Sequence, residues 1–134
     1  MKHLAVVELW DDGMYSIYVP DMEKHNLNAQ GKTVSEAKEK LVEAVLDYVS
    51  FYNEIGKLIP KEIDNPTFEY KYDLASFFDY YDWVNPTKLA AKIGINPSLM
   101  RQYKSRISLA SEKQTGKIQE GINKLGLDLA SVKL

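Results

Sequence analysis

The chain has 134 residues, 45% of them hydrophobic and 27% charged, so it can form one compact domain or two small ones and is too apolar to be disordered. It contains no cysteine, which excludes disulfides, thiolate metal sites and a cysteine nucleophile. The apolar run at its start is too short for a signal peptide or a membrane span, so we expect a cytoplasmic protein, associated with the nucleoid when bound to DNA.

The net charge of -2 conceals two oppositely charged halves. Residues 1–82 carry 8 Lys and Arg against 16 Asp and Glu, a balance of -8, and residues 83–134 carry 9 against 3, a balance of +6. A basic segment favours contact with phosphate, and an acidic one favours a basic partner. Two ordinary solvated surfaces would give the same count. We predict two domains, at residues 1–72 and 73–134.

Three strands are predicted in the first part of the chain. The segments 4–10 and 14–19 are rich in residues that favour strands, and they flank Asp12-Gly13, a pair typical of tight hairpins because glycine accepts a positive φ. Pro20 cannot donate to a sheet, so it should end the second strand. A third, weaker strand is predicted around residues 27–30.

A helix and a fourth strand follow. Thr33 and Glu36 have the spacing of a capping box, which predicts that a helix begins there. Its apolar stripe should cover a sheet and consists of Ala37, Leu41, Ala44, Val45, Tyr48 and Tyr52. The residues expected to face water are Lys38, Glu39, Lys40 and Glu43. Residues 67–72 alternate aromatic and charged side chains, which predicts a strand that buries Phe68, Tyr70 and Tyr72. We therefore expect an α+β fold whose first domain is a β-β-β-α-β antiparallel sheet covered by one helix.

Catalytic and metal-binding patterns are weak. His3 and His25 are interpreted as surface residues, and no His, Asp and Glu cluster has a ligand spacing, so we expect no metal and no cofactor. A carboxylate group near the hairpin, which could hold magnesium for phosphodiester cleavage, comprises Glu8, Asp11, Asp12 and Asp21. Turn chemistry already explains Asp11 and Asp12, so we expect a binding protein rather than an enzyme.

Two short helices are predicted in the second part of the chain. Asn85-Pro86 and Asn96-Pro97 each combine a good N-cap with a proline favoured at the first helical position. The first helix should end at Gly94, and the second should span about residues 97–104. Met100 and Tyr103 should pack inward against Leu89, Ile93 and Ile95, with the small Ala90 where the helices cross. This arrangement is a helix-turn-helix, although an ordinary helical hairpin with a basic face would have the same pattern.

The outer face of the second helix is the candidate DNA-reading surface. Arg and Gln side chains can form paired hydrogen bonds to base edges in the major groove. The predicted base-reading residues are Ser98, Leu99, Arg101 and Gln102. Those predicted to contact phosphates are Thr87, Lys88, Lys92, Asn96, Lys104 and Arg106.

A further helix should close this bundle. It is predicted over about residues 112–125, with Ile118, Ile122 and Leu125 facing inward. Residues 127–132 leave additional apolar side chains that could serve dimerisation.

Two segments of the chain resemble known families. Residues 86–103 resemble the helix-turn-helix of the Cro and phage-repressor class at its Leu-Ala, Gly and inward apolar positions. Residues 12–21 and 31–37 resemble the HicB antitoxin family. The resemblance implies a degenerate ribonuclease H-like domain that binds the small basic HicA toxin, an mRNA-cleaving enzyme, and a second domain that represses the toxin-antitoxin operon. Because residues 22–28 replace the family's Pro-Gly segment, it identifies no toxin-binding residues.

The sequence thus predicts an antitoxin that binds a HicA-like toxin and a palindromic operator as a homodimer or higher even oligomer. Two alternatives stay open. One is a stand-alone repressor whose first domain senses a ligand or dimerises, and the other is a metal-dependent nuclease.

Overall fold

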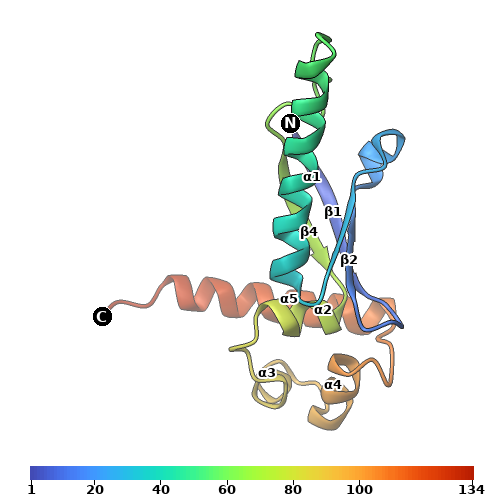
Figure 1. Cartoon of the computed structure of the whole chain (residues 1–134). Helices are drawn as coiled ribbons and strands as arrows, with labels where there is room; N and C mark the ends of the chain where they lie inside the picture. Colours follow the sequence, from blue (N-terminus) through green and yellow to red (C-terminus); the bar gives the residue numbers. More distant parts are fainter. The chain divides into compact units, whose positions relative to one another are not determined.

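The computed structural model describes residues 1–134 and shows a mixed α and β protein whose chain divides into two compact units (Figure 1). We call Met1–Tyr81 unit 1 and Asp82–Leu134 unit 2. The division lies after the boundary predicted at residue 72, because a helix that follows the last strand packs on elements of unit 1. No helix is both long enough and apolar enough to cross a membrane.

Unit 1 contains a four-stranded sheet in the order β3-β2-β1-β4. Its strands are β1 (Lys2–Leu9), β2 (Tyr15–Tyr18), β3 (Asn28–Gly31) and β4 (Thr67–Tyr72), so each predicted strand forms. β2 pairs antiparallel with both β1 and β3. The turn between β1 and β2 has Gly13 at a φ of 80°, and the Gly13 amide donates to the Trp10 carbonyl at 2.9 Å, as the predicted hairpin requires.

The last strand corrects the predicted topology. β4 lies beside β1 and runs parallel to it, with Val7 opposite Tyr72, so the sheet is mixed and the expectation of a purely antiparallel sheet is wrong. The cause is the connection through α1 (Val34–Glu54), which runs back along the sheet after β3. This helix of 21 residues spans about 31 Å, so β4 can start from the same end as β3 and run in its direction.

α1 begins at the predicted position, but only one of the two capping-box bonds forms. The Thr33 hydroxyl accepts a hydrogen bond from the Glu36 amide at 3.1 Å, while the Glu36 carboxylate pairs with Lys40 at 3.2 Å. The predicted apolar stripe does pack in the core of unit 1, which it shares with Ala5, Val7 and Ile17 from the sheet. Its fully or nearly buried members are Ala37, Leu41 and Val45, and its partly buried members are Ala44, Tyr48 and Tyr52.

Two short helices complete unit 1. The 3-10 helix η1 (Pro20–His25) follows β2, buries Met22 in the core and ends at Asn26, which has a φ of 50°. The α-helix α2 (Leu74–Tyr80), which the sequence patterns did not predict, starts directly after β4 at the N-cap Asp73. Phe78 and Ala75 bury the inner face of α2.

Unit 2 is a bundle of three helices, α3 (Pro86–Ile93), α4 (Pro97–Lys104) and α5 (Glu112–Ala130). The starts of all three agree with the prediction, but α5 continues beyond residue 125 to Ala130. The side chains buried in this bundle are Leu89, Ala90, Ile95, Met100, Tyr103 and Ile118.

Candidate functional site

The frame of the candidate DNA-binding site is α3, the turn at Gly94 and α4. Asn85 and Asn96 act as N-caps, because their side-chain oxygens accept hydrogen bonds from the amides of Lys88 at 3.0 Å and Leu99 at 3.1 Å. Gly94 ends α3 with a φ of 80°, a conformation that favours glycine. The local sequence therefore sets both helix starts and the turn between them.

Packing inside the bundle holds this frame. Met100 is fully buried and Tyr103 is 6% exposed, as predicted for the inner face of α4. Ile93 also packs against α5, because a Cβ added at Gly121 would lie 2.6 Å from Ile93 Cγ2. Gly121 is therefore needed where α3 and α5 approach each other.

The predicted base-reading residues lie on the outer side of α4. Ser98 and Arg101 are exposed, and Leu99 and Gln102 are partly exposed. The Arg101 guanidinium donates to the Thr87 hydroxyl at 2.9 Å, which brings a predicted base-reading residue and a predicted phosphate-binding residue together. The Gln102 side-chain oxygen accepts from the Ser108 hydroxyl at 2.8 Å. The amide oxygen has a second lone pair, so Gln102 keeps one acceptor position and its amide N–H groups for a base edge.

The six predicted phosphate-binding residues, Thr87, Lys88, Lys92, Asn96, Lys104 and Arg106, are all exposed. The side-chain oxygen of Asn96 caps α4, so the side-chain NH2 group of Asn96 is the part that can donate to a phosphate. Arg106 follows α4 with a φ of 64°, in the left-handed region that favours glycine or asparagine.

Lys92 lies in a different setting from Thr87. It lines a groove of 490 Å³ between α3 and α5, together with Lys117, Lys124 and the carboxylates Glu120 and Asp128. Lys117 donates to the Gly94 carbonyl at 2.9 Å and so holds the turn of the helix-turn-helix. Neither this role of Lys117 nor that of Ser108 has a local sequence signal, because each depends on a contact made after folding.

The predicted carboxylate group of unit 1 does not assemble. Asp12 accepts from the Met14 amide at 2.9 Å within the hairpin, and Asp21 pairs with His3. No three His, Asp or Glu side chains of residues 1–134 gather where a metal ion could bind.

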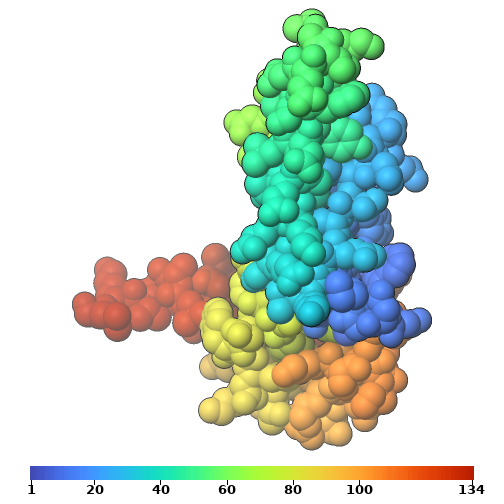
Figure 2. All heavy atoms as spheres, in the orientation of Figure 1, coloured from blue at the N-terminus to red at the C-terminus, as the bar shows by residue number.

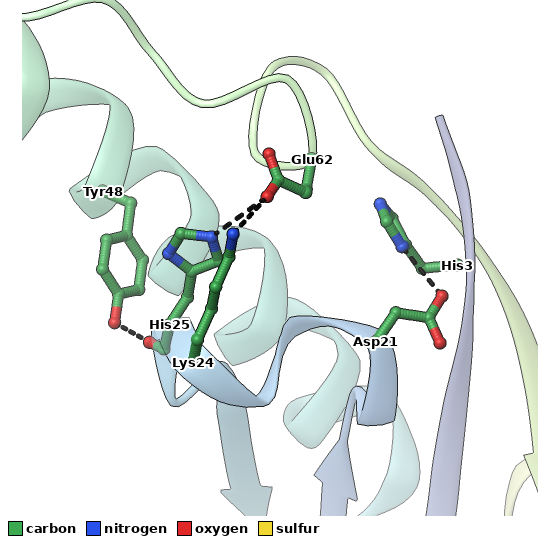
Figure 3. A network of polar contacts seen from close by, with 6 residues as sticks. All are labelled: His3, Asp21, Lys24, His25, Tyr48 and Glu62. Atoms are coloured by element: carbon green, nitrogen blue, oxygen red, sulfur yellow. Dashed lines mark hydrogen bonds and ion pairs between the residues drawn. The ribbon is translucent and has the colours of Figure 1, made fainter.

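The interpretation of His3 and His25 as surface residues is wrong. The His3 side chain is 3% exposed, and its Nδ1 lies 3.0 Å from an Asp21 oxygen, so it joins β1 to η1 (Figure 3). The His25 side chain is 11% exposed and lies near Glu62. His3 is buried and His25 is partly buried because η1 folds against the sheet and the loop before β4, which no local pattern indicates.

A second polar cluster holds the far end of η1. Glu62 lies 3.0 Å from the Lys24 Nζ and 3.6 Å from the His25 Nε2, while the Tyr48 hydroxyl donates to the His25 carbonyl (Figure 3). A backbone hydrogen bond, followed by the contact with Lys24, lowers the pKa of Glu62 to about 2. Glu62 is therefore charged at neutral pH and forms an ion pair with Lys24.

Lys38 corrects another prediction, because its side chain does not face water. Its ammonium lies over the rings of Tyr70, Tyr72 and Tyr80, at 4.1, 5.1 and 3.4 Å from their centroids, and donates to the Tyr72 hydroxyl at 2.6 Å. Burial lowers the pKa of Lys38 to about 8, whereas the three ring faces favour its charged form. Lys38 joins α1 to β4 and α2.

Asp79 on α2 makes a further connection across unit 1. Its carboxylate accepts from the Val34 amide at 2.9 Å, at the first turn of α1. Burial, and then the neighbouring Asp79, raises the pKa of Tyr15 to about 12. The neutral Tyr15 hydroxyl is the form that this environment favours.

The outer face of α1 combines apolar and acidic side chains. Val42 is 52% exposed and Leu46 is 59% exposed, although both are aliphatic. Exposed carboxylates flank them at helical spacing, namely Glu39, Glu43 and Asp47. Figure 2 shows α1 forming a long uncovered column of unit 1 in this view. We call these five residues the α1 face.

Comparisons of the chain with protein-family models, with curated proteins and with solved structures return no match. The resemblance to HicB antitoxins and to phage repressors therefore depends on the motifs of the sequence itself.

Proposed function

We propose that this protein is an antitoxin that represses its own operon by binding a palindromic operator and neutralises a small, basic, HicA-like mRNA-cleaving toxin. In this proposal unit 2 binds DNA, unit 1 binds the toxin, and the protein acts by binding rather than by catalysis. It would act in the cytoplasm, as a homodimer or higher even oligomer, because one helix-turn-helix reads only a short half-site.

The observation that carries the proposal is the capped α3-turn-α4 frame, with Arg101 on its outer side, in a unit where basic residues outnumber acidic ones. An ordinary helical hairpin does not need Arg101 and Thr87 at one surface beside the exposed Lys88. The contact between Arg101 and Thr87 orients the guanidinium before DNA binds, which reduces the conformational entropy lost on binding.

The α1 face is the surface of unit 1 that best suits a basic toxin. Its carboxylates attract a positively charged partner, and Val42 and Leu46 offer apolar area that becomes buried in a complex.

The proposed DNA binding is tested by measuring fluorescence anisotropy with a duplex from upstream of the gene and with a scrambled duplex. Arg101→Ala should weaken operator binding by about 1–3 kcal/mol and reduce discrimination between the two duplexes. Lys104→Ala should weaken binding to both equally and reduce the salt dependence. Lys133→Ala, which removes an exposed cation far from α4 in the sequence, is the control. Unchanged discrimination in Arg101→Ala would contradict the assignment.

The proposed toxin binding is tested by affinity purification of the protein from its native host, followed by mass spectrometry of the proteins that bind it. A stoichiometric small basic protein is expected, and Glu43→Lys should weaken its binding about tenfold, or 1.4 kcal/mol. Glu23→Lys makes the same charge change on η1 and should leave binding intact. Recovery of DNA with no partner protein would favour the second candidate, a stand-alone repressor.

A further inference from the structure

An apolar stripe runs along α5 and extends past the end of the bundle. It consists of Ile118, Ile122, Leu125, Leu129 and Val132, spaced alternately by four and three residues. This spacing places side chains in one row on a helix and is the spacing of helix-pairing seams. Val132 continues the helical turn, because its amide donates to the Leu129 carbonyl at 3.2 Å.

The first residues of this stripe are buried or partly buried, and the last two are exposed. Ile118 is 1% exposed, Ile122 and Leu125 are partly buried, and Leu129 and Val132 are 62% and 57% exposed. In Figure 1 the red end of α5 extends beyond α3 and α4. The first half of the stripe is therefore core, and the second half has the same side-chain pattern without a cover.

The charge of this second half limits what can cover it. Unit 2 is basic, yet residues 125–132 contain a single charged residue, Asp128. Such a segment does not attract phosphate, and it loses little hydration of charge when buried. An identical segment meets these conditions, and two-fold pairing would cover both copies at once.

We propose that residues 125–132, at the end of α5 and directly after it, pair antiparallel with the same residues of a second copy. Leu129 then lies near the two-fold axis, and Leu125 of one copy meets Val132 of the other. The pairing is antiparallel because this places the two bundles at opposite ends of the paired segment, whereas parallel pairing would bring α3 and α4 of both copies to the same end. The inference rests on the proposed function in one respect: it supplies the homodimer that a palindromic operator needs.

Cysteine cross-linking tests the arrangement directly, since the natural chain has no cysteine. Under mild oxidation Leu129→Cys should form a disulfide-linked dimer, whereas Leu127→Cys, on the opposite side of α5, should not. A mixture of Leu125→Cys and Val132→Cys chains should cross-link to each other more than either does to itself. Stronger self-linking of both would mean parallel pairing and would overturn the proposal.

Sedimentation equilibrium of the full chain separates this inference from the proposed function. Leu129→Glu should weaken dimerisation at least about tenfold, whereas Leu127→Glu, an equally polar change at a residue 75% exposed, should not. Equal self-association of both variants and the natural chain would overturn the inference, even if toxin and operator binding were found. Loss of the dimer in Leu129→Glu alone would support the pairing, even if no toxin or operator were bound.

Discussion

At the scale of single residues, the conformation of Arg106 gives the first prediction. A left-handed backbone costs a residue with a Cβ about 1–2 kcal/mol, and the φ of Arg106 is 64°. Arg106→Gly should therefore be more stable to urea than Arg106→Ala by about 1 kcal/mol. Both variants lose the guanidinium, so their difference isolates the backbone. Equal unfolding free energies would contradict the predicted strain.

Tyr15 gives a prediction about pH. Its pKa is raised from 10.0 to about 12 in the folded protein, so its contribution to stability is complete below pH 10 and is lost as the pH rises towards 12. Absorbance titration of tyrosinate in the natural chain and in Tyr15→Phe should differ by one group that titrates near pH 12. A difference that appears near pH 10 would show that burial and Asp79 do not act on Tyr15.

Residue environments were the least predictable part of unit 1. The helical pattern of α1 predicts that Lys38 faces solvent. The rings of Tyr70, Tyr72 and Tyr80, which come from β4 and α2, surround its ammonium in the folded protein. His3 is buried by the same kind of long-range contact, with η1. Sequence periodicity describes one element at a time, so it cannot show a partner that another element supplies.

At the scale of elements, Asp73 explains how α2 is attached. One carboxylate oxygen accepts from the Ser76 amide at 2.8 Å, which caps α2, and the other accepts from the Leu9 amide at 2.9 Å, at the end of β1. Asp73→Ala removes a helix cap and leaves the Leu9 amide without its acceptor, so it should reduce the free energy of unfolding by about 2–4 kcal/mol.

Ser111 provides the matched control. Its hydroxyl accepts a hydrogen bond from the Gln114 amide at 3.2 Å and so caps α5. Unlike the Asp73 carboxylate, it does not also accept a hydrogen bond from a strand. Ser111→Ala should cost about 1 kcal/mol in the same urea titration. If both variants lost equal stability, the bond from Leu9 to Asp73 would contribute nothing.

The elements themselves were largely predictable where the signal is local. Asn85, Asn96 and Thr33 cap their helices as their spacing indicates, because a cap involves only three or four consecutive residues. The direction of β4 was not predictable in this way. It depends on where α1 delivers the chain, and the alternation of Phe68, Tyr70 and Tyr72 is the same for a parallel and an antiparallel strand.

At the scale of the whole molecule, the charge division and the structural division nearly coincide. Unit 1 ends at Tyr81, one residue before the point at which the charge count changes sign. The boundary placed at residue 72 fell short because α2 has no charge signal and too few residues for a clear periodicity. The predicted base-reading residues could be placed on α4 from sequence, but their contacts with Thr87 and Ser108 could not.

The pairing of β1 with β4 also has a consequence for folding during synthesis. β1 is synthesised before its neighbour at the sheet edge, Thr67–Tyr72, which follows some sixty residues later in the chain. Until β4 is made, the backbone N–H and C=O groups on that side of β1 have no partner strand, so the nascent sheet has an open hydrogen-bonding edge. Unit 2, built from helices that follow each other directly, has no comparable delay. The time needed to complete the sheet in unit 1, rather than the time needed to form the helices in unit 2, should therefore determine how long the nascent chain remains prone to aggregation.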